Sequence, residues 1–244
     1  MSRLKVLLLA AGKSTRIGAA AGGGPKPLLL VGGLTILERN LRWLASEGIQ
    51  EVWINLHFKP DSIREAVGDG SRLGVRVRYV YEDELLGTAG AVRNIWERGD
   101  EEFLVVYGDN LYRMDLADFL SFHQDRCGIG SLALFDRRTH PHTGIAAGRV
   151  TLAPDGRILA FHEGADDSSS PIVNAGVYLL RSDAVERIPP GRFHDFGTDL
   201  FPALLADGKA LYGYVISGYC LGVDTPESLQ RAMELIRQGE VELA

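Results

Sequence analysis

A glycine-rich turn near the start of the chain carries two cations at a spacing suited to phosphate chemistry. An apolar run leads directly into Gly12–Arg16, and Lys26 follows ten residues after Arg16. Backbone N–H groups of such a turn can bind anionic oxygens, and two fixed cations can neutralise them. The sequence therefore predicts a triphosphate site. Its cations are Arg16 and Lys26, for which the sequence shows no structural partner.

Two phosphate-binding motifs do not fit this turn. A P-loop needs a glycine five residues before Gly12, and position 7 is leucine. The dinucleotide motif G-x-G-x-x-G needs a glycine where Ser14 stands. A turn with a purely structural role is therefore the alternative to a phosphate site.

A carboxylate follows a buried strand further along the chain. The apolar run Glu102–Tyr107 ends at Gly108 and Asp109. The carboxyl ends of parallel strands meet at one edge of a sheet, so we expect Asp109 near Gly12. Mg²⁺ prefers carboxylate and phosphate oxygens, which makes Asp109 a candidate metal ligand. The alternative is a turn or helix-capping aspartate.

Two further segments have residue types that suit a bound sugar or base. Small residues at 87–91 open a predicted helix and would let a flat group approach, while Thr88 could simply cap that helix. Asn174 interrupts an apolar strand, and a buried amide needs a hydrogen-bond partner. A sugar hydroxyl or a neighbouring backbone group could supply that partner.

The elements that would position these residues alternate along the first 135 residues. Strands are expected over Lys5–Ala11, Glu51–Leu56, Val75–Tyr81, Glu102–Tyr107 and Ile129–Phe135, and helices over Thr35–Glu47, Asp61–Val67, Ala89–Arg98 and Leu116–Gln124. This alternation predicts an α/β fold, a doubly wound, mostly parallel sheet with helices on both faces. Its ligands should lie outside the carboxyl ends of the strands.

The rest of the chain is richer in strands. A hairpin is expected from Ile145–Leu152 and Arg157–His162, strands over Ile172–Leu180 and Ala210–Ile216, and helices over Phe196–Ala206 and Pro226–Gln238. No biased linker separates the two parts. We therefore expect one domain over 1–244, with a nucleotide-binding half at 1–135 and a β-rich, sugar-binding half at 136–244.

Composition narrows the class of protein. The chain has 244 residues, is 45% hydrophobic and has a net charge of −6, which argues against a nucleic-acid surface. Cys127 and Cys220 have no Cys-x-x-Cys spacing and are expected to be free thiols of a reducing compartment. No signal peptide and no membrane-spanning run is evident, so a cytoplasmic protein without a membrane partner is expected.

The order of the motifs resembles the sugar-1-phosphate nucleotidyltransferases, and the resemblance spans nearly the whole chain. The matching segments are Leu9-Ala10-Ala11-Gly12, Thr15-Arg16, Pro25-Lys26-Pro27-Leu28, Leu86-Gly87-Thr88-Ala89-Gly90, Gly108-Asp109, Asn174-Ala175-Gly176-Val177-Tyr178 and Thr225-Pro226. The cytidylyltransferases of isoprenoid synthesis and the molybdopterin guanylyltransferases share the first motif. They do not usually combine it with Pro-Lys-Pro-Leu and Leu-Gly-Thr-Ala-Gly.

The resemblance implies that a nucleoside triphosphate and a sugar 1-phosphate react to a nucleotide-sugar and pyrophosphate, with Mg²⁺ as cofactor. It implies nucleotide contacts from Leu9, Ala10, Ala11, Gly12, Glu82, Gly87, Thr88 and Asp109, and sugar contacts from Gly144, Glu163 and Asn174. Arg16 would bind the leaving phosphates and Lys26 the α-phosphate or the sugar phosphate. The Leu-Gly-Thr-Ala-Gly segment is more similar to mannose- or heptose-1-phosphate guanylyltransferases, which favours GTP.

The chain departs from the family at three places. The family's Gly-x-Gly-Thr-Arg is Gly12-Lys13-Ser14-Thr15-Arg16 here, a milder change that still leaves a small residue. The family's Glu-Lys-Pro is Glu163-Gly164-Ala165 here, and the aspartate of its second metal motif is Gly222, with Asp224 two residues on. Asp224 could serve as the metal ligand, or could cap the helix expected from Pro226, which the Asp-Thr-Pro-Glu sequence favours. The missing groups leave a second hypothesis, a non-catalytic nucleotide or nucleotide-sugar binding protein with a degraded metal site.

Overall fold

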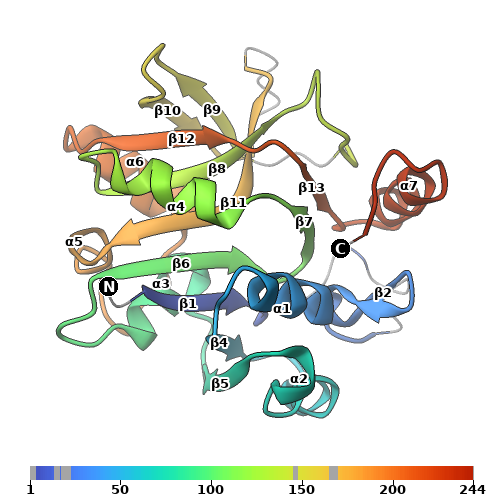
Figure 1. Ribbon diagram of the computed structural model, residues 1–244. Coiled ribbons are helices and arrows are strands. Elements are labelled where there is room, and N and C mark those ends of the chain that lie inside the picture. Colours follow the sequence, from blue (N-terminus) through green and yellow to red (C-terminus); the bar gives the residue numbers. More distant parts are fainter. Residues whose placement is uncertain (1–3, 14–16, 18–22, 145–147, 165–169, 244) are drawn as a thin grey trace.

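The computed structural model describes residues 4–13, 17, 23–144, 148–164 and 170–243. Its main sheet contains β1 (Leu4–Leu9), β4 (Glu51–Leu56), β5 (Arg76–Tyr81), β6 (Glu102–Tyr107), β8 (Gly130–Asp136), β9 (Arg149–Leu152), β10 (Ile158–His162), β11 (Ile172–Arg181) and β12 (Leu211–Val215). The order is β10-β9-β11-β6-β1-β4-β5, with β8 beside β11 and β12 beside β8 (Figure 1).

Most strands of this sheet point the same way. β1 is parallel to β4 and β6, and β4 is parallel to β5. β11 is antiparallel to both β6 and β8, so β8 and its parallel partner β12 share the direction of β1. The prediction of a mostly parallel α/β sheet is confirmed, and the carboxyl ends of β1 and β6 lie together at one edge.

Helices cover both faces of the sheet, as predicted. They are α1 (Ile36–Ser46), α2 (Pro60–Val67), α3 (Gly87–Ile95), α4 (Leu116–Gln124), α5 (Ser182–Val185), α6 (Phe201–Ala206) and α7 (Pro226–Arg237). Leu8 of β1 belongs to a core with α1, α2 and α4, whereas Leu7 belongs to a second core with α3, α5 and α6. Successive residues of β1 thus enter opposite cores, because side chains alternate along a strand.

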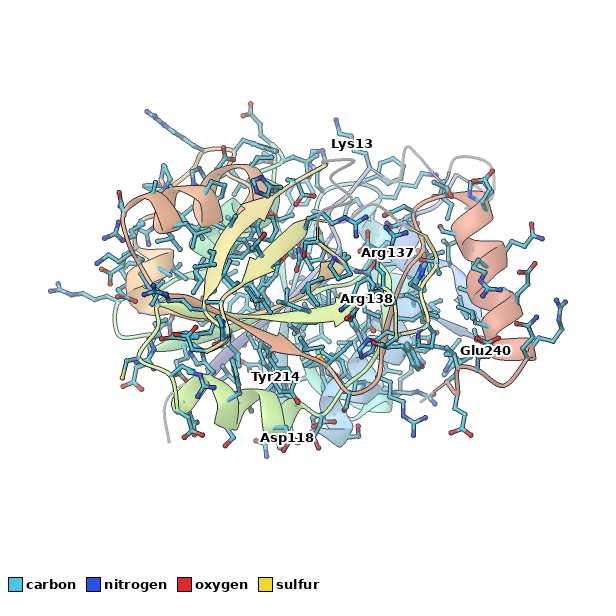
Figure 2. All side chains as sticks on the ribbon, turned by 90° about the horizontal axis from the view of Figure 1, so that it is seen from above. Lys13, Asp118, Arg137, Arg138, Tyr214 and Glu240 are labelled. Carbon is cyan, nitrogen blue, oxygen red and sulfur yellow. The ribbon has the colours of Figure 1, made fainter. Side chains whose placement is uncertain are left out.

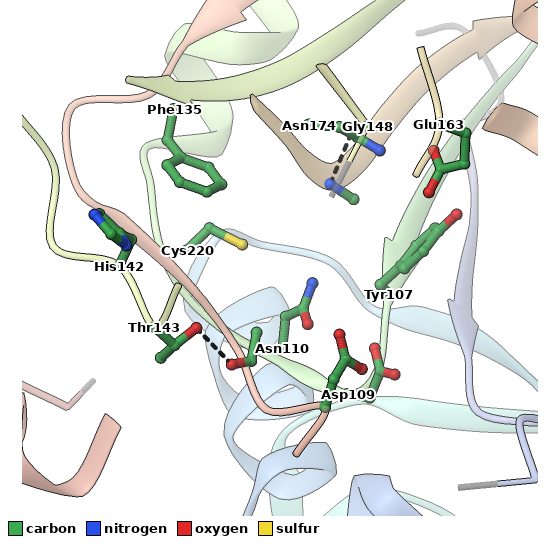
Figure 3. Close-up of a pocket in the computed structure, with 13 residues that line it drawn as sticks. Tyr107, Asp109, Asn110, Phe135, His142, Thr143, Gly148, Glu163, Asn174 and Cys220 are labelled. Atoms are coloured by element: carbon green, nitrogen blue, oxygen red, sulfur yellow. Dashed lines mark hydrogen bonds between the residues drawn. The ribbon is translucent and has the colours of Figure 1, made fainter. Parts of the chain in front are cut away.

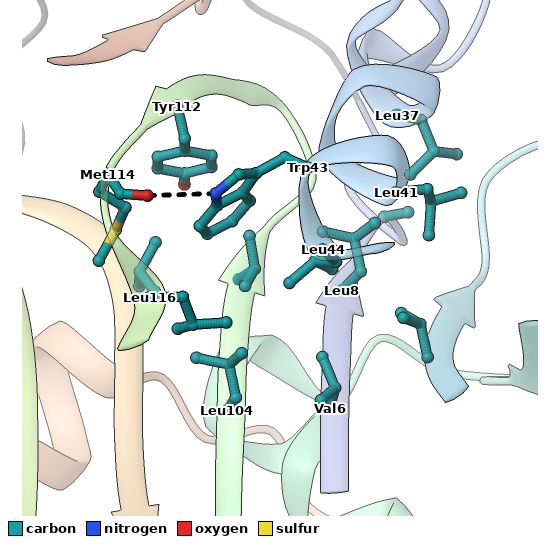
Figure 4. Packing of buried hydrophobic residues seen from close by; sticks show 14 of the residues in the cluster. Val6, Leu8, Leu37, Leu41, Trp43, Leu44, Leu104, Tyr112, Met114 and Leu116 are labelled. Atoms are coloured by element: carbon teal, nitrogen blue, oxygen red, sulfur yellow. Dashed lines mark hydrogen bonds between the residues drawn. The ribbon is translucent and has the colours of Figure 1, made fainter. Parts of the chain in front are cut away.

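Helix α1 is fixed at its start and along its buried face. Thr35 and Glu38 form a capping box, which confirms the predicted cap. Leu44 lies near Leu8 on β1, and the Trp43 ring lies beside Tyr112, with ring centroids 5.7 Å apart (Figure 4). The buried indole N–H of Trp43 donates to the Met114 carbonyl oxygen at 3.2 Å. Helix α1 is thereby joined to the segment that follows β6.

Helix α4 covers the β12 end of the sheet. Phe119 of α4 and Tyr214 of β12 have ring centroids 5.3 Å apart. From above, Asp118 and Tyr214 lie on the same side of the molecule, and α7 lies at one end, near Glu240 (Figure 2). Within the described residues, none of the helices is long and apolar enough to span a bilayer.

Several short elements were not predicted. They are the 3-10 helices η2 (Lys26–Leu28) and η3 (Ser71–Leu73), the strands β2 (Leu30–Val31), β3 (Leu34–Thr35), β7 (Asn110–Arg113) and β13 (Tyr219–Gly222), and helix α5. The helix predicted over Phe196–Ala206 is divided into a π-helical turn η4 (Phe196–Leu200) and α6. Strands β7 and β13 pair antiparallel, with Gly222 opposite Asn110. This pairing brings the segment before α7 to the end of β6.

Candidate active site

The ammonium group of Lys26 lies between two carboxylates that are far away in the sequence. Lys26 Nζ forms ion pairs with Asp109 and with Asp224. The side chain of Lys26 is only 9% exposed, while those of Asp109 and Asp224 are 30% and 15% exposed. Burial alone would lower the pKa of Lys26, but the two carboxylates outweigh it and raise that pKa above its usual value. Lys26 is therefore protonated at neutral pH.

This cluster corrects two expectations. Lys26 was expected to have no structural partner, but it forms ion pairs with Asp109 and Asp224. No local sequence pattern predicts these pairs, because both aspartates lie far from Lys26 in the sequence. Asp224 does not cap α7, because Thr225 is the N-cap and its side chain accepts from the Ser228 N–H. Asp224 lies before the cap, beyond the end of β13, and its side chain is directed to Lys26.

A cavity of about 260 Å³ lies between the end of β1 and the start of α3; we call it the β1–α3 cavity. Its walls are Leu9, Ala11, Gly12, Asn55, Leu85, Gly87, Thr88, Tyr107, Asp109, Phe193 and Asp195. The structure thus brings together six of the eight predicted nucleotide-binding residues. Ala10 and Glu82 are buried behind the wall, and each is only 2% exposed. Arg16 lies outside the described residues.

Asn55, which the sequence analysis missed, connects the buried pair Ala10 and Glu82. Its Oδ1 accepts from the Ala10 N–H at 2.8 Å, and its Nδ2 donates to Glu82 Oε1 at 2.8 Å. Glu82 Oε2 in turn accepts from the Leu86 N–H at 3.1 Å. Through Asn55, the carboxylate of Glu82 therefore connects Ala10, directly after β1, to Leu86 at the start of α3. An asparagine within an apolar strand was the available signal.

Thr88 has a different role from the predicted cap. Helix α3 starts at Gly87, its N-cap residue is Leu86, and no side chain caps it. The Thr88 hydroxyl donates to Asp195 Oδ2 at 2.7 Å and accepts from the Phe196 N–H at 3.0 Å. Thr88 thus holds the loop before η4 against α3.

A second cavity, of about 160 Å³, lies between β11 and β13; we call it the β11–β13 cavity (Figure 3). Its walls are Tyr107, Asp109, Asn110, Phe135, His142, Thr143, Gly148, Glu163, Asn174, Gly176, Cys220, Gly222 and Asp224. Tyr107 and Asp109 line both cavities. The two cavities therefore meet at the end of β6, where Lys26 contacts Asp109.

Asn174 has partners within its own strand. A register shift in β11 lies between Asn174 and Tyr178. Asn174 Oδ1 accepts from the Gly176 N–H at 3.0 Å, and Nδ2 donates to the Tyr178 hydroxyl at 2.6 Å. Gly176 has φ +76°, and a Cβ there would lie 2.9 Å from the Tyr107 ring. Asn174 therefore stabilises the irregular part of β11 that packs against Tyr107, and it also borders the cavity.

The other predicted sugar-side residues differ in their placement. Glu163 lines the β11–β13 cavity, opposite His142 (Figure 3). Gly144 is exposed and lies next to the cavity wall rather than in it. Burial and the nearby Arg137, Arg231 and Arg149 lower the pKa of His142. From its sequence, His142 beside a proline is expected to be a solvated loop residue, but it lines this cavity and is a mainly neutral donor or acceptor at neutral pH.

The donor set around Lys26 fits a hard cation. Asp109 and Asp224 both contact one ammonium group, so their oxygens already converge on a single cation position. Among the described residues, no group of three or more His, Cys, Asp or Glu side chains suits a metal. Two carboxylates match Mg²⁺, which usually takes one or two protein carboxylates and completes its shell with phosphates and water.

Comparisons with known proteins identify the family of this chain. The sequence profile of the nucleotidyl transferase family matches residues 5–239. A mannose-1-phosphate guanylyltransferase of Mycobacterium tuberculosis is 35% identical, over 96% of this chain and 65% of its own length. A UTP–glucose-1-phosphate uridylyltransferase of Synechocystis is 30% identical, over 86% of this chain and 57% of its own length. The chain thus spans less than two thirds of either relative.

A solved structure extends the likeness to the fold. HddC from Yersinia pseudotuberculosis, complexed with GMP-PN, superposes with a TM-score of 0.76 and 25% identity. The match covers 94% of this chain and 98% of that one. With the profile match over almost its full length, the chain belongs to the nucleotidyl transferase family.

Proposed function

We propose that this protein transfers the nucleoside monophosphate part of a nucleoside triphosphate, with GTP favoured, to a sugar 1-phosphate. The products are a nucleotide-sugar and pyrophosphate. The observation that carries the proposal is the contact of Lys26 with Asp109 and Asp224, where the β1–α3 and β11–β13 cavities meet. A triphosphate in the first cavity and a sugar phosphate in the second would face each other at this point.

The bond changes are those of an in-line displacement. An oxygen of the sugar phosphate forms a bond to the α-phosphorus, and the bond from that phosphorus to the bridging oxygen breaks. Pyrophosphate leaves with the electron pair. Catalysis then consists of positioning both phosphates and neutralising the charge on them, without a covalent intermediate.

Each group of the cluster has a role in this scheme. When bound between Asp109 and Asp224, Mg²⁺ would supply positive charge and fix phosphate oxygens. Lys26 would then leave the carboxylates and donate to the α-phosphate or the sugar phosphate. The residues around Tyr107 and Asn174 would hold the sugar ring, and Arg16 would neutralise the leaving phosphates.

The choice of GTP rests on relatives and on one motif. The Leu-Gly-Thr-Ala-Gly segment resembles that of guanylyltransferases, one relative is named a mannose-1-phosphate guanylyltransferase, and the similar Yersinia structure holds GMP-PN. The alternative of a binding protein without activity depended on a degraded metal site. The position of Asp224 beside Asp109 argues against that alternative.

A panel assay tests the proposal. Pyrophosphate release is measured with GTP, ATP, UTP, CTP and dTTP against several sugar 1-phosphates, with Mg²⁺ and with EDTA. We expect Mg²⁺-dependent release that needs both substrates and is fastest with GTP. Binding of GTP without release from any pair would support the binding-protein alternative instead.

A further inference from the structure

Phe193 is an exposed aromatic residue on the wall of the β1–α3 cavity. Its exposed fraction is 64%, in the loop between α5 and η4. Single exposed apolar residues are common on protein surfaces, so exposure alone assigns no role. Two further observations indicate a role for Phe193: it lies on the wall of a cavity, and its loop is anchored by hydrogen bonds.

Hydrogen bonds fix the chain immediately after Phe193. The His194 N–H donates to the Leu86 carbonyl at 2.8 Å, and the His194 carbonyl accepts from the Ala89 and Gly90 N–H groups, both at 3.0 Å. With the contacts of Thr88 to Asp195 and Phe196, these bonds fasten the loop to the start of α3. Phe193 is therefore held at the mouth of the cavity by backbone bonds to its next residue.

The two glycines of the Leu-Gly-Thr-Ala-Gly segment, Gly87 and Gly90, allow the backbone of this loop to approach α3 closely. A Cβ at Gly87 would lie 2.5 Å from the His194 carbonyl oxygen, and one at Gly90 would lie 2.9 Å from the Arg192 carbonyl oxygen. From the sequence alone, these small residues predict space for a base or sugar. In the structure the space next to both glycines holds the backbone of the Phe193 loop.

We infer that Phe193 stacks on the nucleobase of the bound nucleotide and strengthens binding through its ring face. This inference rests on the proposed function. The cavity wall includes Ala11 and Gly12 after β1 and also Asp109, where the phosphates are expected. Phe193 and Leu85 provide apolar surface on the same wall. A base has a flat π-face that such a ring can cover, and stacking on an aromatic side chain tolerates different bases.

The test measures binding rather than turnover. Dissociation constants for GTP and for inorganic tripolyphosphate are compared in wild type, Phe193→Ala, Phe193→Leu and Phe193→Tyr. We expect the alanine variant to bind GTP about tenfold more weakly, the leucine variant to recover little of this, and the tyrosine variant to match wild type. Tripolyphosphate, which has no base, should bind all four proteins equally.

A matched control and a spectroscopic readout complete the experiment. Leu159→Ala removes another exposed apolar side chain, 54% exposed on β10, and should leave GTP binding unchanged. Phe193→Trp should add a fluorescence signal that GTP changes and tripolyphosphate does not. Equal GTP affinities of wild type and the alanine variant would overturn the stacking role, as would equal losses for GTP and tripolyphosphate.

The outcomes separate this inference from the proposed function. A wild type that binds GTP with a Phe193-dependent affinity but transfers to no sugar 1-phosphate would refute the transferase proposal and support stacking. A wild type that binds no nucleoside triphosphate would overturn both.

Discussion

Replacing Lys26 by methionine keeps much of the apolar stem and removes the ammonium group. The carboxylates of Asp109 and Asp224 then face each other without the cation between them. Removing one partner of a buried ion pair costs about 3–5 kcal/mol, whereas an exposed pair is worth about 0–1 kcal/mol. Because both aspartates are partly exposed, this ion-pair cluster is intermediate between a buried and an exposed pair. We therefore expect the unfolding free energy to fall by about 2 kcal/mol in EDTA.

The effect should depend on divalent cations. We expect Mg²⁺ to occupy the position that the ammonium group leaves, and a ligand that binds only the folded state stabilises that state. Urea unfolding of Lys26→Met should therefore give a higher unfolding free energy with Mg²⁺ than with EDTA, so that Mg²⁺ restores part of the lost stability. Wild type, in which Lys26 competes for the carboxylates, should respond much less in the absence of nucleotide.

Lys5 provides a matched control at the opposite edge of the sheet. Its Nζ lies 2.8 Å from Asp100 Oδ2 and 2.9 Å from the Ile95 carbonyl oxygen, and its side chain is 13% exposed. Lys5→Met breaks a comparably buried ion pair and should lose stability that Mg²⁺ does not restore. Equal responses of the two variants to Mg²⁺, or an unchanged stability of Lys26→Met, would refute the reasoning.

The remaining predictions concern the two proposed metal ligands, one glycine and one buried histidine. Asp109→Asn and Asp224→Asn should each lower Mg²⁺-dependent pyrophosphate release by at least about 10²-fold, since each removes charge stabilisation worth about 2.7–4 kcal/mol; a near-normal rate for Asp224→Asn would show that Asp109 alone suffices. Gly87→Ala should lower the unfolding free energy by about 1–3 kcal/mol, and clearly more than Gly208→Ala, because both have positive φ but a Cβ at Gly208 meets nothing within 4 Å. Burial and the nearby Arg181 lower the pKa of His123 from 6.5 to about 4, so the folded state favours the neutral ring; stability is fully present above pH 6.5 and should fall by up to about 3 kcal/mol on the way to pH 4. Acid titration of His123→Gln should lack that part of the loss, and parallel curves for both proteins would contradict this assignment.

The periodicity of the sequence was enough to predict most of the sheet. Continuous apolar runs such as Glu102–Tyr107 became buried strands, and the cap at Thr35 was confirmed, because these features depend on residues close together in the chain. Strands β7 and β13 were missed. Each has only four residues, and their pairing depends on a partner about a hundred positions away.

The same distinction separates what was predicted of the site from what was not. Gly12, Gly87, Thr88 and Asp109 line one cavity, because strand ends and the residues that follow them share one sheet edge. The local sequence around Asp224 favoured a helix cap, yet its side chain contacts Lys26, because the β7–β13 pairing brings it there. Long-range pairing of this kind leaves no periodic signal.

The central claim is that a sugar phosphate oxygen attacks the α-phosphorus where the two cavities meet. It is tested most directly with GTP, Mg²⁺ and a sugar 1-phosphate whose phosphate oxygens carry ¹⁸O, followed by mass spectrometry of the products. The account predicts that the nucleotide-sugar retains all of the label and that pyrophosphate has none. Labelled oxygen in pyrophosphate, or GMP formed by hydrolysis without any nucleotide-sugar, would contradict it.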